Sequence, residues 1–301
     1  MSLFVPESEP VASHYASQEL ETVILNALIK AGKDPDRLKP EDLAPIDEFH
    51  IRGRKATLEL ARELGLREGM QVLDVGCGLG GASRQLALEF GCQVTGLDLT
   101  AEYCRVASLL AARLGLADRV SYRQGNALAL PFADACFDAL WTQHAAMNIA
   151  DKARLYGEMW RVLKPGGVLA IYDILAGAGG PVHFPVPWAR DSSISFLISP
   201  AQLRQTLETA GFEILSWRDS TETGRSWFRH LGAKIAQDGP PPLGLQLLLG
   251  PEFRQMARNQ VRNLEEDRVS LIEAIVRRPS AASSSAAGQP SNVNSTIERS
   301  S

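Results

Sequence analysis

The chain has 301 residues, of which 45% are hydrophobic and 22% charged, a balance that excludes a disordered or fibrous protein. Because 31 basic side chains stand against 35 acidic ones, the net charge is -4 and we expect no nucleic-acid partner. The four cysteines form no C-x-x-C pair, and no run approaches the ~18 apolar residues of a membrane helix. The start MSLFVPESEP lacks the basic region of a signal peptide. We therefore expect a reduced, cytoplasmic protein without a membrane partner.

The first predicted element is an amphipathic helix. From Ser17 onward, apolar residues recur at helical spacing, with Leu20, Ile24 and Leu28 on one face and Gly32 as a stop signal. The next stretch, up to Arg54, holds three prolines and many charges, so we expect an ordered connection rather than a core element. Residues 1–54 are thus assigned to an N-terminal helix with a lid-like connection.

Residues 55–225 form the predicted core. A helix over residues 55–64 is followed by short β-branched runs that alternate with helical patterns, such as QVLDVG, GASRQLALEF, CQVTGLD and AEYCRVASLLAARLG. Regular alternation of this kind predicts an α/β fold, doubly wound around a mostly parallel sheet. A Gly- and Pro-rich stretch before the last helix of this core has no period, and loops of that length are usually lids or binding loops.

The C-terminal part is predicted to be helical over residues 226–278. One stripe of apolar residues carries this expectation: Phe253, Met256, Leu264, Leu271, Ile272 and Ile275. Residues 279–301 are rich in Ser and Ala and have almost no large apolar side chains, so we expect a disordered tail.

A glycine loop carries the strongest functional signal. The strand residues 72–75 run into Gly76, Gly78 and Gly80 and then into a helix, an arrangement that brings bare backbone and unpaired N–H groups close to a ligand. Eighteen residues after Gly80, the second strand ends at Asp98, whose carboxylate can accept both hydroxyls of a ribose. The glycines also fit the dinucleotide spacing, but Asp74 would be unfavourable beside a pyrophosphate and favourable beside a cationic amino group. This favours S-adenosylmethionine as cofactor.

The third predicted strand ends at Asn126. Its amide could pair with an adenine edge, or the residue could simply form a turn, and both interpretations stay open. No phosphate-binding P-loop sequence occurs.

The order VLDVGCGLGG, GLDLT and KPGG, the last at 164–167, resembles the class I S-adenosylmethionine-dependent methyltransferases over residues 48–219. The resemblance implies a Rossmann-like fold with a mostly parallel seven-stranded sheet, an added N-terminal helix and C-terminal helices. It also implies a set of cofactor-binding residues: Asp74, Gly76, Gly78, Gly80, Asp98, Leu99, Asn126, Ala127, Thr142 and Gln143.

A finer resemblance concerns the acceptor. The sequence DEFHIRGR at 47–54 is similar to the sarcosine and dimethylglycine N-methyltransferase group, which implies a small amine as acceptor. The alternative is a C- or O-methyltransferase acting on a small aromatic, quinone-like or prenyl-type acceptor. A non-catalytic cofactor-binding module ranks below both. The expected partner is a small molecule, and the oligomeric state stays open.

Candidate catalytic residues follow from the chemistry of methyl transfer, which needs alignment and exclusion of water more than a triad. An attacking nitrogen must be neutral, so we single out His144 and His50 as bases and Gln143 as their neighbour at the methyl-transfer centre. The candidate substrate residues are Asn148, Tyr172, His183 and Trp188. The five histidines show no ligand spacing, so no metal is predicted.

Overall fold

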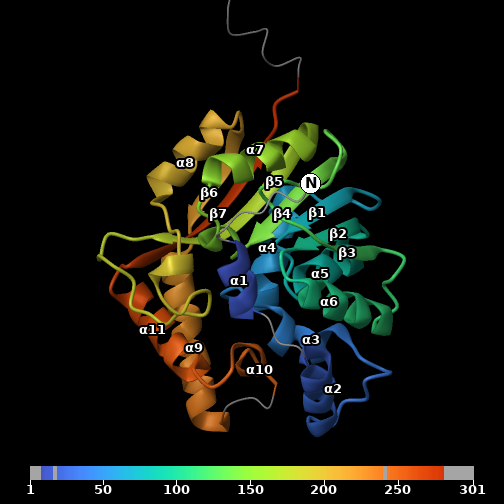
Figure 1. The fold of residues 1–301 in the computed structure, drawn as a ribbon, viewed down its shortest axis with the longest axis vertical. Helices are drawn as coiled ribbons and strands as arrows, with labels where there is room; N and C mark the ends of the chain where they lie inside the picture. Colours follow the sequence, from blue (N-terminus) through green and yellow to red (C-terminus); the bar gives the residue numbers. More distant parts are fainter. Residues whose placement is uncertain (1–7, 16–18, 240–242, 281–301) are drawn as a thin grey trace, which may run out of the picture.

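The computed structural model describes residues 8–15, 19–239 and 243–280, and a seven-stranded sheet forms its centre (Figure 1). The strand order is β3-β2-β1-β4-β5-β7-β6. Strands β1 to β5 pair in parallel, whereas β7 runs antiparallel to both β5 and β6. The strand bounds are β1 Gln71–Val75, β2 Gln93–Asp98, β3 Val120–Gln124, β4 Phe137–Gln143, β5 Leu163–Ala176, β6 Glu213–Asp219 and β7 Val269–Arg277. The predicted doubly wound, mostly parallel seven-stranded sheet is confirmed.

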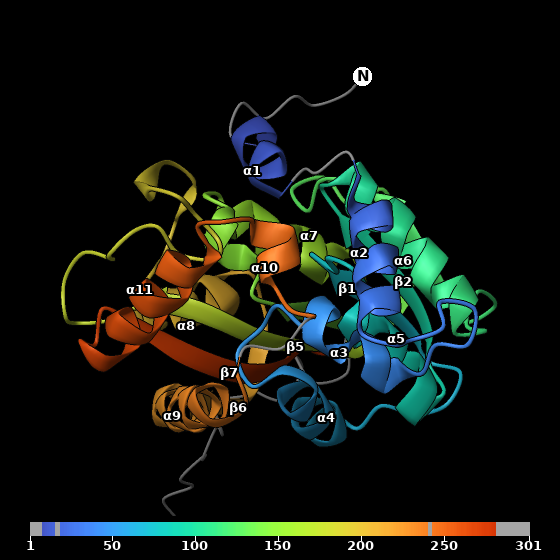
Figure 2. The ribbon, with the colours of Figure 1, turned by 90° about the horizontal axis from the view of Figure 1, so that it is seen from below.

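Helices cover both faces of the sheet because successive strand side chains point to opposite sides and both sides are apolar. Val72 of β1 belongs to the same hydrophobic cluster as Leu60 of α4, whereas the next residue, Leu73, belongs to the cluster that includes Met159 of α7. Figure 2 shows α4 and α9 on one side of the sheet. The bounds are α1 Ser8–Tyr15, α2 Leu20–Lys30, α3 Pro40–Asp47, α4 Gly53–Leu64, α5 Gly81–Phe90, α6 Ala101–Arg113, α7 Lys152–Val162, α8 Pro200–Thr209, α9 Thr221–Asp238, α10 Gln246–Leu249 and α11 Phe253–Glu265.

The N-terminal segment contains two helices, α1 and α3, beyond the one that the sequence indicated. The predicted helix is present as α2, with Leu20, Ile24 and Leu28 buried against α6. The connection that follows was expected to be ordered without contributing to a core, yet it contains α3, whose Leu43 and Ile46 are buried. Pro40 stands in the first turn of α3, where its missing N–H costs nothing, and the helix is too short for its inner proline to break a long ladder.

The C-terminal segment differs from the predicted run of helix. Residues 269–277 form the strand β7 and not the end of a helix, so the expected apolar stripe through Leu271, Ile272 and Ile275 is wrong. Inserted between β5 and β6, this strand is buried on both faces, which makes its sequence a nearly continuous apolar run without a period of two. Most of the predicted tail, residues 281–301, lies outside the described residues.

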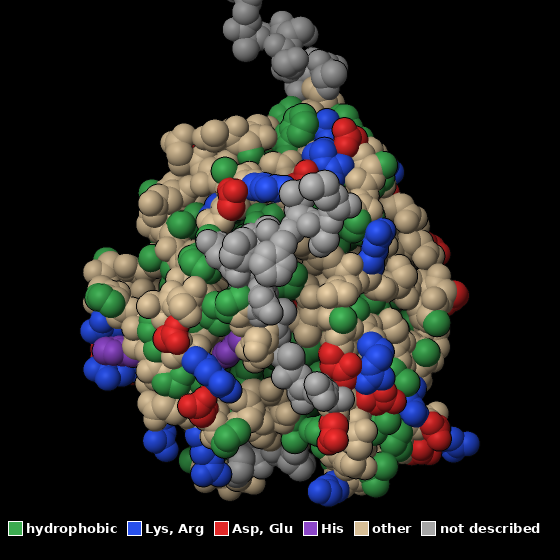
Figure 3. Space-filling view, in the orientation of Figure 1, with side chains coloured by type: hydrophobic (Ala, Val, Ile, Leu, Met, Phe, Trp, Pro, Cys, Tyr) green, Lys and Arg blue, Asp and Glu red, His purple; other side chains and the backbone are tan. Residues whose placement is uncertain are grey.

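The period-free stretch between β5 and α8 is a long connection as expected. It contains one short 3-10 turn, η2 (Ser192–Ile194), and a single bridge between Val186 and Ala189. On the face shown in Figure 3, basic and acidic side chains are interspersed. Among the described helices, none is both long and apolar enough to cross a membrane.

Candidate functional site

A cavity of about 680 Å3 opens at the carboxyl ends of β1, β2, β3 and β4, where ligands bind in open parallel sheets. Its wall also includes the segment before α4, the start of the connection after β4, and the helices α9 and α11. The fold brings most of the predicted site residues to this wall: His50, Asp74, Gly76, Gly78, Asp98, Leu99, Asn126, Ala127, Thr142, Gln143, His144, Asn148 and Trp188. Gly80, Tyr172 and His183 are not among the described lining residues.

The glycine loop after β1 approaches the cavity as bare backbone. Gly76 has a φ of 78°, and a Cβ there would lie 2.4 Å from the Cβ of Ala145. Gly78 has a φ of 54°, and its backbone N–H donates to Asp98 at 2.9 Å. Both positions therefore require glycine, one for space and both for the left-handed backbone.

Gly80 serves the fold and not the cavity wall. It precedes α5 in a left-handed conformation, and a Cβ at this position would lie 2.2 Å from the hydroxyl of Tyr122. In the structure Gly80 allows close packing of the loop against β3, and its role as a cofactor contact stays a prediction. Residue spacing alone did not decide which glycine is the third of the motif, because the glycines fit both the S-adenosylmethionine and the dinucleotide spacing.

Asp98 sits at the end of β2, held by two backbone N–H groups. Gly78 donates to one carboxylate oxygen and Thr100 to the other, both at 2.9 Å. Burial raises the pKa of this carboxyl, and these hydrogen bonds oppose the shift. The carboxylate is thus fixed in place at the cavity wall with lone pairs still available, because each oxygen can accept more than one bond.

Asp74 is the second acidic group on this side of the cavity. It is 2% exposed and accepts a hydrogen bond of 2.6 Å from the Ser83 hydroxyl. Burial raises its pKa to about 7, and the neighbouring charge of Asp98 contributes in the same direction. A cation bound beside Asp74 would relieve this repulsion and favour the ionised form.

Asn126 follows β3 and combines the two roles left open by the sequence. Its side-chain oxygen accepts from the Leu128 N–H at 2.8 Å, which closes an Asx-type turn. The residue also lines the cavity, next to Ala127. The turn uses the amide oxygen, so the amide nitrogen is the group that can donate to a ligand.

The end of β4 carries the polar centre of the cavity. Gln143 accepts from the Thr57 hydroxyl at 3.1 Å, while its Nε2 is buried and has no partner among the described residues. His144 has a φ of 49°, a strained value for a non-glycine residue, and its Nε2 likewise lacks a partner there. Unpaired buried polar atoms in a cavity wall are groups that a ligand can satisfy.

His50 reaches the same centre from the segment before α4. Its Nε2 lies 2.9 Å from the Gly53 carbonyl oxygen and 2.9 Å from the Thr57 hydroxyl. Because a carbonyl only accepts, we assign the ring proton to Nε2, which leaves Nδ1 as the acceptor. The ring centroids of His50 and His144 are 6.2 Å apart.

Both histidines are neutral near pH 7. Burial lowers the pKa of His50 to about 4 and lowers that of His144 well below its ordinary value, with His50 adding to the second shift. Neutral imidazoles can accept a proton at a free ring nitrogen but do not attract an anionic group.

The four candidate substrate residues divide into two pairs. Asn148 and Trp188 line the cavity, and the Asn148 amide donates to the Trp188 carbonyl at 2.8 Å, which holds the long connection against η1 (Ala146–Asn148). Tyr172 is fully buried in the sheet, 4.8 Å from the His144 ring by centroids. His183 lies 2.9 Å from Glu266. Tyr172 therefore lies beside His144 and His183 beside Glu266, and the expectation that these two residues touch the acceptor stays a prediction.

Several lining residues carried no distinguishing sequence signal. Glu48, beside His50, is paired with Gln85, and burial raises the pKa of its carboxyl to about 8. Trp227 and Phe228 of α9 and Gln260 of α11 line the far side. Their helical spacing was visible, but an apolar face turned to a cavity has the same period as one packed in a core. The residues that the structure describes contain no cluster of three or more potential metal ligands.

A family model described as a methyltransferase domain matches residues 73–171. Sterol 24-C-methyltransferase of Eremothecium gossypii is 35% identical over 169 residues, which cover 54% of this chain and 45% of that protein. O-methyltransferase resE of Aspergillus sclerotiorum is 30% identical over 199 residues, which cover 64% of this chain and 74% of that protein. The chain spans about half the length, or less, of the sterol methyltransferases it matches.

Solved structures share the fold over most of the chain. The 4+2 cyclase SpnF superposes with a TM-score of 0.67 and 25% identity, covering 91% of this chain and 97% of that one. Phosphoethanolamine N-methyltransferase 2 of Haemonchus contortus, in complex with S-adenosyl-L-methionine, gives a TM-score of 0.66 at 23% identity, covering 77% and 54%. This chain belongs to the class I S-adenosylmethionine-dependent methyltransferases. The names of its relatives refer to carbon, oxygen and nitrogen acceptors, so they leave the acceptor atom open.

Proposed function

We propose that this chain transfers a methyl group from S-adenosylmethionine to a carbon or oxygen atom of a largely apolar small molecule. The observation that carries the proposal is the apolar character of the cavity wall away from β2 and β3. That wall is lined by Met147, Trp188, Trp227, Phe228, Leu231, Phe253 and Val261. Such a surface gains free energy when it covers an apolar ligand.

The residues on the other side of the cavity fit the cofactor. We assign the methionine part to Gly76, Gly78 and Asp74, because bare backbone and a buried carboxylate suit a zwitterion with a cationic amino group. Asp98 would accept the ribose hydroxyls, and the Asn126 amide nitrogen would donate to the adenine ring. Bound S-adenosylmethionine supplies an activated methyl group, and the chain supplies binding, alignment and shelter from water.

The two histidines would handle the acceptor proton. His50 Nδ1 and the free nitrogen of neutral His144 can each accept a proton from a hydroxyl or an acidic carbon at the polar centre. The surrounding apolar wall excludes water, which strengthens such an interaction. Residues 1–54 and 226–278 contribute Phe49, α9 and α11 to this wall, and we propose that both segments act as its cover.

The amine alternative draws less support from the segment that suggested it. Asp47 pairs with Arg84, Arg52 pairs with Glu273 at 2.7 Å, and Arg54 pairs with Glu89 at 2.6 Å. These charged groups of the sequence 47–54 are therefore engaged in intramolecular ion pairs. A hydrophilic amine would also leave the aromatic wall without a complementary ligand.

The test uses the full chain, cofactor labelled in its methyl group, and acceptor panels of matched size: phenols, quinone precursors, prenyl-type alkenes and secondary amines. We expect label in a C- or O-methylated product, identified by mass spectrometry, and loss of label transfer in Asp98→Ala. Label only in N-methylated amines would restore the amine alternative.

Label that stays in the cofactor while an acceptor is converted would indicate a reaction without methyl transfer, which must be tested because a protein named a 4+2 cyclase shares this fold. Cofactor binding without conversion of any acceptor would favour the non-catalytic binding module.

A further inference from the structure

Helix α11 carries three buried amide side chains, Asn259, Gln260 and Asn263. Asn259 donates to the Pro185 carbonyl at 2.9 Å and Asn263 donates to the His183 carbonyl at 3.0 Å. These two residues, one helical turn apart, share the face that fastens the long connection after β5. Gln260 points about 100° further round the helix, away from that connection.

Gln260 has no partner in the part of the chain that the structure describes. The residue is 3% exposed, and both its Oε1 and its Nε2 are buried and make no hydrogen bond with any described residue. A buried amide without partners lowers stability, so it needs an explanation other than the fold.

The place of Gln260 in the cavity supplies that explanation. It lines the same cavity as the glycine loop, on a helix that presents both apolar residues such as Val261 and the charged residues Arg258 and Glu265 to the cavity. Figures 1 and 2 both show α11 on the side of the molecule opposite to β2 and β3. Gln260 is thus a buried polar group with unused donor and acceptor capacity on the α11 side of the wall.

We propose that Gln260 is a specificity-determining residue that binds a carbonyl or hydroxyl oxygen of the otherwise apolar acceptor. The amide Nε2 donates to either kind of oxygen, and Oε1 accepts from a hydroxyl. This inference rests on the proposed function, because it describes the ligand as a methyl acceptor. The hydrogen bond between Gln260 and that ligand does not itself require methyl transfer. A pure hydrocarbon of the same shape would leave the amide unsatisfied and would be discriminated against.

The variant that tests the proposal is Gln260→Leu, which removes the polar amide atoms and ends in an apolar branch one atom closer to the backbone. The matched control is Asn259→Leu at the neighbouring buried amide. If Gln260 only served the fold, both variants would lower Tm. We expect Asn259→Leu to lower Tm, because it breaks the contact with the Pro185 carbonyl, and Gln260→Leu to leave Tm unchanged or raise it.

The binding probe is 6-propionyl-2-dimethylaminonaphthalene, an apolar ketone whose emission shifts to the red when its carbonyl accepts a hydrogen bond. The comparison probe is the same ring with a propyl group in place of the ketone. With S-adenosylhomocysteine present, we expect Gln260→Leu to raise the Kd of the ketone about two- to tenfold and to shift its emission to the blue. The propyl probe should bind the two proteins equally or prefer the variant.

Equal Kd values for the ketone in both proteins, or an equal loss for both probes, would overturn the role of Gln260. If neither probe bound, the proposal that the cavity takes an apolar acceptor next to Gln260 would be wrong as well. Failure of the methyltransferase proposal would look different: the probes would still distinguish the two proteins while the labelled-cofactor assay yielded no methylated product.

Discussion

Two side chains near the carboxyl ends of parallel strands give negative charge to the part of the cavity that we assign to the cofactor. Asp98 and Asp74 end neighbouring strands, and both lie in the cavity wall. Each is held by short hydrogen bonds from the protein, at 2.9 Å from Gly78 and at 2.6 Å from Ser83. Burial of two carboxylates near each other is unfavourable unless a ligand completes the site, which makes both residues sensitive probes of binding.

Replacing Asp98 by Ala should weaken S-adenosylmethionine binding by about 1.5–3 kcal/mol, or roughly 10- to 150-fold in Kd, because a charge-assisted hydrogen bond to the ribose is lost. Calorimetric titration measures the effect. The exposed Asp118 provides the control, and Asp118→Ala should bind as the unchanged chain does. An unaltered Kd in Asp98→Ala would contradict the ribose assignment.

The raised pKa of Asp74 predicts a pH dependence of cofactor affinity. With a pKa of about 7, the free carboxyl is largely protonated at pH 6, whereas a bound cation favours the carboxylate. Binding should then release a proton, and affinity should fall by up to about tenfold for each pH unit below 7. The cofactor amino group stays protonated in this range, since α-amino groups titrate near ~7.7–8.0.

Titrations at pH 6 in two buffers of different ionisation enthalpy count the protons released. In Asp74→Asn the part of the release that Asp74 contributes should vanish and the pH dependence should flatten. Equal proton release in Asp74→Asn would assign the effect to another group, such as Glu48, whose pKa is also raised.

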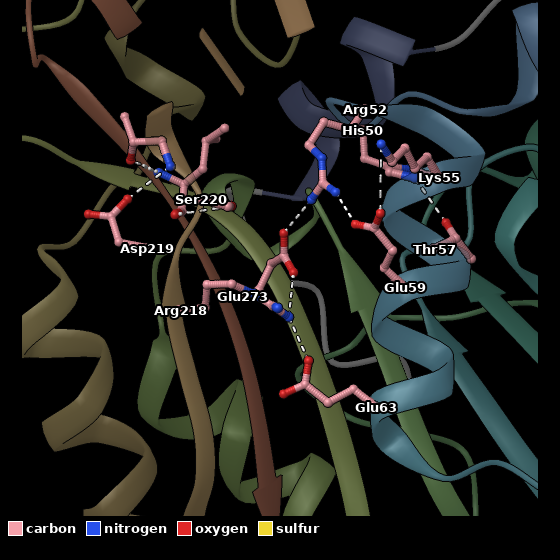
Figure 4. Close-up of polar contacts among 12 residues, drawn as sticks. His50, Arg52, Lys55, Thr57, Glu59, Glu63, Arg218, Asp219, Ser220 and Glu273 are labelled. Atoms are coloured by element: carbon pink, nitrogen blue, oxygen red, sulfur yellow. Dashed lines mark hydrogen bonds and ion pairs between the residues drawn. The ribbon is translucent and has the colours of Figure 1, made fainter. Parts of the chain in front are cut away.

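At the scale of elements, a buried ion-pair network fastens α4 to the far edge of the sheet (Figure 4). Arg52, with a φ of 73° before α4, reaches Glu273 of β7 at 2.7 Å, and Arg218 of β6 reaches the same carboxylate at 3.1 Å. Glu273 is 2% exposed. The network fastens the segment that carries His50, a residue of the cavity wall, to β7.

Removing one partner of this buried pair should be costly. Glu273→Leu removes the buried partner of Arg52 and leaves it only its ion pair with the more exposed Glu59, so we expect a loss of up to about 3–5 kcal/mol in the free energy of unfolding. The double variant Arg52→Met with Glu273→Leu should recover much of the loss, because two apolar groups then replace two charges. Urea unfolding of the unchanged chain, the two single variants Arg52→Met and Glu273→Leu, and the double variant measures the coupling energy between the two side chains. Losses in the free energy of unfolding that simply add would show that the side chains are not coupled.

At the scale of the whole molecule, Arg278, the residue after β7, binds the end of α7 and the start of β5. Its guanidinium donates to the carbonyls of Trp160 and Leu163 at 2.9 and 2.6 Å and lies 3.6 Å from the centre of the Trp160 ring. A cation at the end of a helix satisfies carbonyls that have no partner within the helix. Arg278 is therefore part of the folded unit, and we propose that the predicted tail begins after it.

Two truncations test that boundary. A chain that ends at Ser280 should keep the Tm of the full chain, because the predicted tail has no core-forming pattern. A chain that ends at Arg277 loses the Arg278 contacts and should unfold roughly 4–8 °C lower, as expected for about 2 kcal/mol in a domain of this size. The point variant Arg278→Ala in the full chain should reproduce that shift. A fall in Tm on removing residues 281–301 alone would show that the tail contributes to the fold.

The sequence by itself determined the features that depend on neighbouring residues. The alternation of strands and helices, the glycine loop and Asp98 could be predicted because backbone conformation and hydrophobic period are local properties. The methyltransferase class followed from those local motifs and their order.

Only the tertiary structure decided features that join distant segments. Strand β7 could not be located because burial on both faces removes the period that distinguishes a strand from a buried helix. Arg52 and Glu273, 221 positions apart, gave no pairwise signal, and the helical spacing of α11 did not reveal that Gln260 faces a cavity. Each of these depends on which elements the sheet places side by side, and the energy of burying a charge or an amide is defined only once its surroundings are fixed.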